Sequence, residues 1–401
     1  MSAPGVAAPH LVTVSGQDGP GIAARLFASL ARQGVAVEDV EQVRVHGRLL
    51  LCVEVALASP AAAGLGAALR EELGATGVEV TVEPLSEAEI DEVSDRHLVT
   101  VLAPDIDAVT LEGVAGAVAA CGGNIERIVR LAAYPVHSYE LIVVGSDLDE
   151  LRRRLASEAA HHQIDIAVQV AGLHRRAKHL IVMDADSTLL QGEVIDLLAE
   201  RHGCGAAVAA VTEAAMAGDI DFEEALRQRV HLLAGLKESD LDVVKEGMQL
   251  TPGARTLVRT LKRLGYEIAV VSGGFTQVID ELVRDLGIDH LTANELVLDG
   301  GVLTGELRGP VVDRAGKAEA LVRFAAAAGV PVARTIAVGD GANDIDMLAA
   351  AGLGIAFNAK PVVRRAADTA LSVPYLDAIL FLLGISRREV EEADRQEDSV
   401  A

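Results

Sequence analysis

Four apolar segments in the second half of the chain alternate with stretches of helical pattern. They read KHLIVMD, EIAVVSG, HLTANELVLDG and RTIAVGD. Strands that alternate with helices form a mostly parallel sheet with crossover connections. Ligands of such sheets bind outside the carboxyl ends of the strands. We therefore expect an α/β domain over residues 173–395, with a functional site at one edge of its sheet.

Polar residues suited to phosphate chemistry follow the expected strands. They are Asp184-Ala185-Asp186-Ser187-Thr188, Ser272-Gly273-Gly274, Lys317 in DRAGKAEAL, and GDGANDIDML from Gly339 to Leu348. A phosphomonoester is dianionic, so its catalyst must neutralise charge and hold a nucleophile in line. Taken alone, Asp186 is as well explained as a helix N-cap, and Lys317 as an exposed helix residue. The presence of all four groups in one chain favours the catalytic interpretation.

The order and spacing of these groups resemble the four motifs of the haloacid dehalogenase superfamily of phosphatases. DADST, VVSGG, Lys317 and GDGAND match the first to fourth motifs, and the resemblance covers roughly residues 174–390. It implies a Rossmann-like parallel-sheet core with a helical cap, which we expect over residues 193–261. It also implies that Asp184 attacks phosphorus and forms an aspartyl phosphate, while Asp186 acts as general acid and then as general base.

The same resemblance implies Mg²⁺ as the cofactor. Its expected ligands are the side chains of Asp184 and Asp340 and the backbone carbonyl of Asp186. Mg²⁺ keeps several waters, so one or two carboxylates and the substrate are sufficient. Asp344 is either a further metal ligand or a hydrogen-bond acceptor that supports the ligands without touching the ion. The phosphate itself is expected to bind Ser272, the Gly273 amide and Lys317.

Further residues, in and beyond the four motifs, resemble those of the phosphoserine phosphatases within this superfamily. They are Glu193, nine residues after Asp184, Arg229 in LRQRVHLL, Asn343, and the strings SGGF and NAKP. The resemblance implies O-phospho-L-serine as substrate, with Glu193 facing its ammonium group and Arg229 its carboxylate. The products would be L-serine and phosphate, in the last step of serine biosynthesis. Arg229 alone could equally be a surface arginine of a helix.

Two other activities are compatible with the same motifs. A phosphotransferase would form the same intermediate and pass the phosphoryl group to another alcohol. A phosphatase for another small phosphomonoester would differ only in its cap residues.

An internal repeat occupies the first half of the chain. HLVTV occurs at residues 10–14 and again at 97–101, and Asp18 and Asp105 lie at the same offset in the two copies. In both, the pattern predicts strand, helix, two strands, helix and strand, a ferredoxin-like βαββαβ unit. We therefore expect domains over residues 1–90 and 91–172, ahead of the third domain from residue 173.

The loop GQDGPGI of the first copy resembles the ligand loop of ACT domains, which bind amino acids and usually pair. The resemblance implies an effector such as L-serine, with Asp18, Gly19 and Gly21 of one copy facing Asn124 of another. It also implies a homodimer or higher homo-oligomer formed through these domains. The glycines are equally consistent with a simple turn. An amino-acid sensor with a vestigial enzyme domain is conceivable, but every expected catalytic residue is present.

Composition disfavours other classes of partner. The formal net charge of -24 repels nucleic acid and anionic membranes. No apolar run approaches the roughly 18 residues of a membrane span, and MSAPGVAAPH lacks the basic and apolar regions of a secretory signal, so we expect a cytoplasmic protein. Cys52, Cys121 and Cys204 lie far apart, which disfavours a disulfide framework or a thiolate zinc site.

Overall fold

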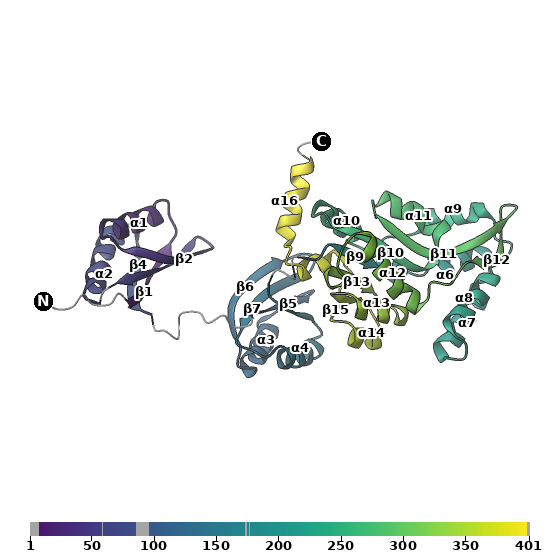
Figure 1. Ribbon diagram of the computed structural model, residues 1–401, viewed down its shortest axis with the longest axis horizontal. Helices are drawn as coiled ribbons and strands as arrows, with labels where there is room; N and C mark the ends of the chain where they lie inside the picture. The colour runs from purple at the N-terminus through teal and green to yellow at the C-terminus, as the bar shows by residue number, and fades with distance from the viewer. Residues whose placement is uncertain (1–7, 58, 86–95, 173–174, 176, 399–401) are drawn as a thin grey trace. The chain divides into compact units, whose positions relative to one another are not determined.

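The computed structural model describes residues 8–57, 59–85, 96–172, 175 and 177–398 (Figure 1). It divides into two compact units, Met1–Ser94 and Asp95–Ala401. The domain boundary predicted at residues 90–91 and the predicted start of the third domain at residue 173 lie outside the described residues. Among the described helices, none combines the length and the apolar character that crossing a membrane requires.

The first unit is a four-stranded antiparallel sheet covered by two helices. Its strand order is β2-β3-β1-β4. Alternate residues of the strands are apolar, and Val12, Val14, Leu51 and Val53 are completely or almost completely buried in a core that also contains Leu26 of the first helix. The elements are β1 (Ala8–Gln17), α1 (Ile22–Arg32), β2 (Ala36–Val45), β3 (Arg48–Leu57), α2 (Ser59–Leu73), η1 (Gly74–Thr76) and β4 (Val78–Pro84).

The second repeat has the same topology and begins the second unit. Its strand order, β6-β7-β5-β8, places the four strands as in the first repeat. The ferredoxin-like βαββαβ prediction is therefore confirmed for both copies. The elements are β5 (Arg96–Ala103), α3 (Ala108–Ala120), β6 (Asn124–Ala132), β7 (His137–Val144), α4 (Leu148–His162) and β8 (Asp165–Val170).

A seven-stranded sheet forms the centre of the catalytic half, in the order β12-β11-β10-β9-β13-β14-β15. All neighbouring pairs are parallel except β11 and β12, which form an antiparallel pair at one edge. The Rossmann-like prediction is confirmed. The strands are β9 (Leu180–Met183), β10 (Glu267–Phe275), β11 (His290–Asp299), β12 (Val302–Arg308), β13 (Thr335–Gly339), β14 (Gly354–Phe357) and β15 (Thr369–Leu371).

Five α-helices lie between β9 and β10, over the range in which the cap was expected. The last of them contacts β10 and completes the crossover between the two strands, and the predicted cap range of 193–261 includes most of that helix. They are α6 (Val194–His202), α7 (Gly205–Ala217), α8 (Phe222–His231), α9 (Glu238–Gly247) and α10 (Ala254–Arg263).

The remaining helices connect the later strands or follow the sheet. They are α11 (Thr276–Asp285), α12 (Arg314–Ala327), η3 (Val332–Arg334), η4 (Ala342–Asp344), α13 (Ile345–Ala350), α14 (Pro361–Ala366), η5 (Leu376–Ala378), α15 (Ile379–Leu382) and α16 (Arg387–Asp398).

The second repeat has a hydrophobic core of its own and also contributes buried residues to the core of the catalytic sheet. Leu131 and Val136 of the repeat belong to the same buried cluster as Leu380 and Val390, which follow the sheet. Polar contacts reinforce this junction: Gln169 Nε2 donates to the Leu382 carbonyl at 2.9 Å. The first repeat also encloses its own cluster, but none of its described residues belongs to the core of the catalytic sheet. The two copies of the duplication therefore differ in how they are built into the chain.

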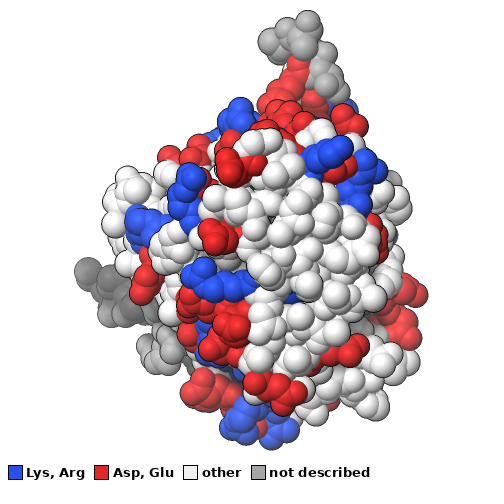
Figure 2. All heavy atoms as spheres, turned by 90° about the vertical axis from the view of Figure 1, so that its right-hand side faces the viewer, with Lys and Arg blue, Asp and Glu red and all other residues white. Residues whose placement is uncertain are grey.

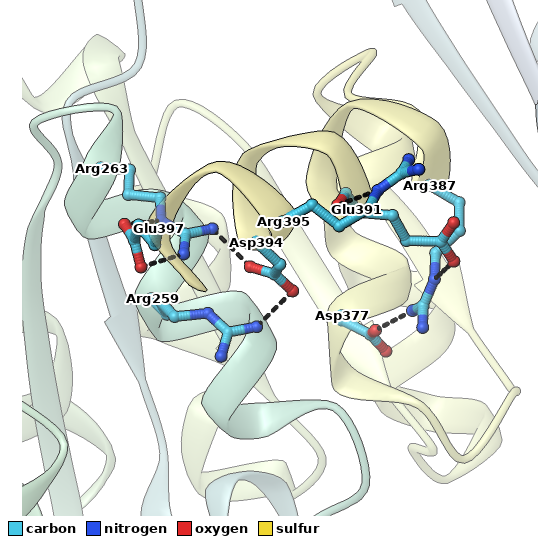
Figure 3. Close-up of polar contacts among 8 residues, drawn as sticks. All are labelled: Arg259, Arg263, Asp377, Arg387, Glu391, Asp394, Arg395 and Glu397. Carbon is cyan, nitrogen blue, oxygen red and sulfur yellow. Dashed lines mark hydrogen bonds and ion pairs between the residues drawn. The ribbon is translucent and has the colours of Figure 1, made fainter. Parts of the chain in front are cut away.

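The last helix, α16, is held against α10 by ion pairs (Figure 3). Arg263 contacts Asp394 at 2.5 Å and also pairs with Glu397, and Arg259 contacts Asp394 at 2.6 Å. At the other end of α16, Arg387 contacts Asp377 at 3.0 Å. The charged tail of the sequence is thus an ordered helix as far as residue 398.

The charges on the face shown in Figure 2 are mixed. Basic side chains lie singly or in small groups among acidic ones, and the middle of the face carries few charges. With a net charge of -24 on the whole chain, local cations rather than a broad basic surface must bind an anionic substrate.

Candidate active site

Three adjacent strands bring the predicted catalytic residues to one edge of the sheet. The strand β9 lies between β10 and β13 and is parallel to both. Asp184 follows β9 directly, Ser272 and Gly273 lie near the end of β10, and Asp340 follows β13. Because parallel strands end at the same edge, these side chains meet although the sequence separates them widely.

Asp184 is buried, with 3% of its surface exposed, and is held by two donors. Its Oδ1 accepts the Ala185 N–H at 2.8 Å and contacts Lys317 Nζ at 2.7 Å. Burial and the nearby Asp344 carboxylate raise the pKa of Asp184 well above its ordinary value, and Lys317 opposes that rise. A divalent cation placed beside this carboxylate would favour its ionised form.

Asp186 lies two residues on, in the turn η2 (Ala185–Leu189), and its carboxylate is fixed from two sides. Its Oδ1 accepts the Val194 N–H at 2.7 Å, and its Oδ2 accepts the Ser272 hydroxyl at 3.3 Å. Burial first, and then repulsion from Glu193, raises the pKa of Asp186 to about 7. A carboxyl group with such a pKa can give up and take back a proton near neutral pH.

Lys317, in α12, is completely buried and links two carboxylates. Its Nζ contacts Oδ1 of Asp184 and Oδ1 of Asp344, both at 2.7 Å. Burial alone would lower the pKa of Lys317, but the two carboxylates outweigh it and raise the pKa above its ordinary value. The lysine therefore stays charged, and the interpretation of it as an exposed helix residue is wrong.

The carboxylates of Asp184, Asp340 and Asp344 form a cluster in which one oxygen of each lies within 4.8 Å of the others. Asp340 accepts the Thr188 hydroxyl at 3.3 Å, and burial followed by repulsion from Asp344 raises its pKa to about 6. Asp344 is fully buried, and its Oδ2 accepts the Gly341 N–H at 2.9 Å. Three oxygen ligands at such spacing, with raised pKa values on two of them, fit a hard divalent cation.

Ser272, Gly273 and Gly274, near the end of β10 where its pairing with β11 is irregular, form the compact loop that was predicted to bind phosphate. The Ser272 hydroxyl accepts the Gly274 N–H at 2.8 Å while it donates to Asp186. A Cβ atom at Gly274 would lie 2.9 Å from Asp186 Oδ2, so a side chain there would displace the carboxylate. Gly273 lines the cavity beside these residues.

Asn294, in β11, fixes this loop from behind and was not predicted. It is almost completely buried, and its Nδ2 donates to the Gly273 carbonyl at 2.8 Å. Its Oδ1 accepts the Val312 N–H at 2.8 Å. The amide therefore joins the Gly273 peptide to the segment that leads into α12, which carries Lys317.

A cavity of about 80 Å³ lies over these residues and is closed by the helical segment. Glu193 and Arg229 line it together with the apolar Ile195, Phe222 and Leu226. Asn343 lies on the opposite, sheet side. Ile195, Phe222 and Leu226 are lining residues that the motifs did not indicate. The structure brings together all eight residues predicted for catalysis and substrate binding. They are Asp184, Asp186, Glu193, Arg229, Ser272, Gly273, Lys317 and Asn343.

Glu193 and Arg229 influence each other across the cavity. Partial removal from water and the neighbouring Asp196 raise the pKa of Glu193, and Arg229 opposes that rise. Burial lowers the pKa of Arg229, while Glu193 and Asp196 oppose the fall. Both groups therefore lack full solvation, and a ligand that carries both signs of charge would compensate each of them.

The residues predicted for an effector lie in the two separate units. Asp18 pairs with Arg44 at 2.6 Å, and Gly21, with a φ of 90°, precedes α1. Gly19 lies between them in the same loop. Asn124 is the exposed first residue of β6 in the second unit. A shared site for these residues stays a prediction.

Comparison with known proteins agrees with this arrangement. Residues 181–349 match the haloacid dehalogenase-like hydrolases, and residues 9–83 and 95–169 each match an ACT domain. The chain is 53% identical to the phosphoserine phosphatase of Streptomyces coelicolor over 97% of its own length and 95% of that protein. It is 49% identical to the phosphoserine phosphatase of Mycobacterium tuberculosis over 96% and 95% of the two chains.

A solved structure extends the likeness to the fold. The probable phosphoserine phosphatase of Vibrio cholerae, in its unliganded form, superposes with a TM-score of 0.58 and 33% identity, covering 74% of this chain and 88% of that one. The motifs, the strand-end geometry and the relatives therefore agree, and the chain belongs to the phosphoserine phosphatase family of haloacid dehalogenase-like hydrolases, with two ACT domains ahead of the catalytic domain.

Proposed function

We propose that the protein hydrolyses O-phospho-L-serine to L-serine and phosphate through an aspartyl phosphate on Asp184. The observation that carries this proposal is a single small cavity lined by Asp184 and Asp186 on one side and by Glu193 and Arg229 on the other. The first pair supplies the chemistry of phosphoryl transfer, and the second pair matches the two charges of an amino acid. The activity of the relatives supports the same substrate.

In the first step, Asp184 attacks phosphorus and the bond from phosphorus to the serine oxygen breaks. Lys317 and the Ala185 N–H engage Oδ1, so we assign the attack to Oδ2. Asp186, in its protonated form, donates its proton to the departing serine oxygen. Lys317 stabilises negative charge on the transferring group throughout.

In the second step, water attacks the phosphorus of the aspartyl phosphate. Asp186, now ionised, takes a proton from that water, and the bond from Asp184 to phosphorus breaks. Orthophosphate is released and Asp186 regains its proton, so both carboxyl groups return to their starting state. A pKa of about 7 for Asp186 suits both proton transfers.

The acidic cluster fits Mg²⁺, with the side chains of Asp184 and Asp340 and the backbone carbonyl of Asp186 as ligands. Bound there, Mg²⁺ supplies positive charge that offsets the charge of the phosphate and of the clustered carboxylates. Asp344 uses one oxygen for Lys317 and the other for the Gly341 N–H, which favours its role as an acceptor behind the ligands.

The substrate amino and carboxyl groups are assigned to the cap. Glu193 would pair with the ammonium group and Arg229 with the carboxylate, while Ser272, Gly273 and Asn343 hold phosphate oxygens. Phe222 and Leu226 exclude water from the same space.

We further propose that the reaction completes serine biosynthesis in the cytoplasm. An effector such as L-serine would act at the ACT domains, and these domains would join a homodimer or larger homo-oligomer.

The test is phosphate release from a panel of phosphomonoesters, with Mg²⁺ and with an excess of chelator. We expect O-phospho-L-serine to be the best substrate, phosphoethanolamine and phosphoethanol to be much poorer, and chelator to abolish turnover until Mg²⁺ is restored. Asp184→Asn should release no phosphate and form no phosphoenzyme in acid-quenched samples. Turnover by Asp184→Asn would refute the mechanism, and equal rates on all three substrates would refute the assigned specificity.

A further inference from the structure

A second cavity lies within the second unit, between the second ACT domain and the catalytic domain. Its volume is about 380 Å³, and it shares no lining residue with the cavity over Asp184. Residues of α4 and β8 form one wall, and residues of α14 and β15 form the other. Neither the motifs nor the proposed reaction uses any of them.

Two buried side-chain oxygens in its wall have no hydrogen-bond partner among the described residues. Asp165, 5% exposed, accepts the Ser372 N–H at 2.5 Å through Oδ2, but its Oδ1 has no hydrogen-bond partner among the described residues. The hydroxyl of Thr369, 6% exposed, also has none in that part of the chain. Buried polar atoms are nearly always satisfied, so these two oxygens are available to accept hydrogen bonds from a bound molecule.

Guanidinium groups stand at the rim of the same cavity. Arg364 Nη2 lies 3.9 Å from Asp165 Oδ1, too far for a hydrogen bond, so neither group saturates the other. Arg152 and Arg365 also line the cavity. The nearby Asp368 is already engaged, because its Oδ2 accepts the Gly354 N–H at 2.8 Å. Three guanidinium groups therefore line the cavity together with two carboxylates, of which Asp165 is buried and Asp368 is exposed.

The floor between these charges is apolar. Leu155, Ile164 and Val168 line the cavity and are buried. A ligand that satisfies the whole site needs a donor for Asp165 and Thr369, an anion for Arg364, and an aliphatic part.

We propose that this cavity binds a free α-amino acid with an aliphatic side chain. Its ammonium group donates to Asp165 Oδ1 and Thr369 Oγ, and its carboxylate accepts from Arg364. Its side chain packs on Leu155 and Ile164. Because both domains line the cavity, the bound ligand stabilises their junction. The site is distinct from the proposed effector loop of the first ACT domain and does not depend on the phosphatase reaction.

The chemistry of the ligand is tested by calorimetry on the full chain with L-leucine and two analogues. Isoamylamine keeps the ammonium group and side chain but lacks the carboxylate, and 4-methylpentanoate lacks the ammonium group. We expect saturable binding of L-leucine and at least about 10-fold weaker binding of each analogue, which corresponds to about 1.4 kcal/mol. Absence of saturable L-leucine binding would overturn the proposal, as would equal affinity for either analogue.

The position of the site is tested with a matched pair of variants on α4. Ala156 lines the cavity, whereas Ser157, its neighbour, does not, and both side chains are exposed. Ala156→Trp should abolish L-leucine binding and Ser157→Trp should preserve it, with similar melting temperatures for both proteins. Arg364→Gln provides a second loss of binding that needs no added bulk. Undiminished binding in Ala156→Trp and Arg364→Gln would place L-leucine elsewhere and contradict the assignment.

Discussion

The burial that adjusts Asp186 for proton transfer also costs stability. Its pKa is raised from 3.8 to about 7, so the folded state binds a proton more tightly than the unfolded state does. Stability therefore falls as pH rises from about 4 to about 7, and the cost is fully present above that window. The charged form of Asp186 is tolerated because its two hydrogen bonds and Lys317 partly offset the burial.

We predict that Asp186→Asn makes the metal-free protein more stable while it slows turnover. In chelator, its free energy of unfolding should exceed that of the parent protein at pH 8, and the difference should shrink toward pH 4. Urea unfolding at several pH values measures this. With Mg²⁺, both chemical steps should slow by about 10²–10⁴-fold. The exposed Asp299 offers a control, as Asp299→Asn, and a stability difference independent of pH would contradict the assignment.

Asn294 should act on substrate binding through the loop it holds. Asn294→Ala leaves the Gly273 carbonyl and the Val312 N–H without their partner, at a cost of about 1–3 kcal/mol for each buried group. We expect a rise of roughly 10-fold or more in KM and in the inhibition constant of orthophosphate, with a smaller fall in kcat. Steady-state kinetics separates the two parameters. A fall in kcat alone, with unchanged phosphate inhibition, would exclude a positioning role.

The sequence indicated the site residues unevenly. Asp184, Lys317 and Asp340 lie in strings that resemble the motifs of a known superfamily, and Asp184 and Asp340 also follow expected strands, so the sequence predicted that they meet. Asn294 is a single amide inside an apolar strand, and nothing local distinguishes it from an ordinary strand residue. Its role depends on which backbone groups lie opposite it, and only the packing of β11 against the loop near the end of β10 determines that.

The strands, too, could be predicted only in part from the sequence. The strands β9, β10, β11 and β13 were predicted because each lies in an apolar segment that is followed by polar residues and alternates with a helical pattern. The strands β14 and β15 cover only Gly354–Phe357 and Thr369–Leu371, too short for a period to be visible. They form one edge of the sheet, where β14 pairs with β13 and β15 pairs with β14, and this pairing rather than their own sequence makes them strands.

The helix α16 is attached by a buried contact and by an exposed ionic network, and the two should differ in strength. Val390 is 3% exposed and belongs to the main core, whereas Asp394 pairs with Arg259 and Arg263 near the surface. We predict that Val390→Ala lowers the free energy of unfolding by about 1.5–3 kcal/mol. Asp394→Asn should lower it by at most about 1 kcal/mol, and less in high salt. Denaturant unfolding of both variants would reveal a reversed order, which would make the ion pairs the main attachment.

At the scale of the whole molecule, truncation of the chain should have different effects on stability for the two ACT domains. Both have a core of their own, but only the second also buries residues, among them Leu131 and Val136, in the cluster that contains Leu380 and Val390. We predict that a chain of residues 96–398 unfolds cooperatively and keeps its phosphatase activity. A chain of residues 175–398 exposes the shared apolar surface and should aggregate or melt at a much lower temperature. The free energy of unfolding of a domain is only about 5–15 kcal/mol, so the loss of this buried surface is a large fraction of it. Equal melting temperatures would show that the shared core contributes little.

This difference also decides how effector binding should be tested. Loss of a serine effect in residues 175–398 would not distinguish a missing site from a damaged fold. Residues 96–398 lack Asp18, Gly19 and Gly21 but keep the junction, so a serine effect that disappears there would implicate the first ACT domain.

The shared core has a consequence for the nascent chain on the ribosome. The first ACT domain needs only its own residues, so it can fold as soon as it emerges. The second cannot bury Leu131 and Val136 until Leu380 and Val390, near the far end of the chain, have been made. For most of translation the emerging protein therefore carries one finished domain followed by a second whose apolar surface is still open, and that interval is when chaperones are needed most.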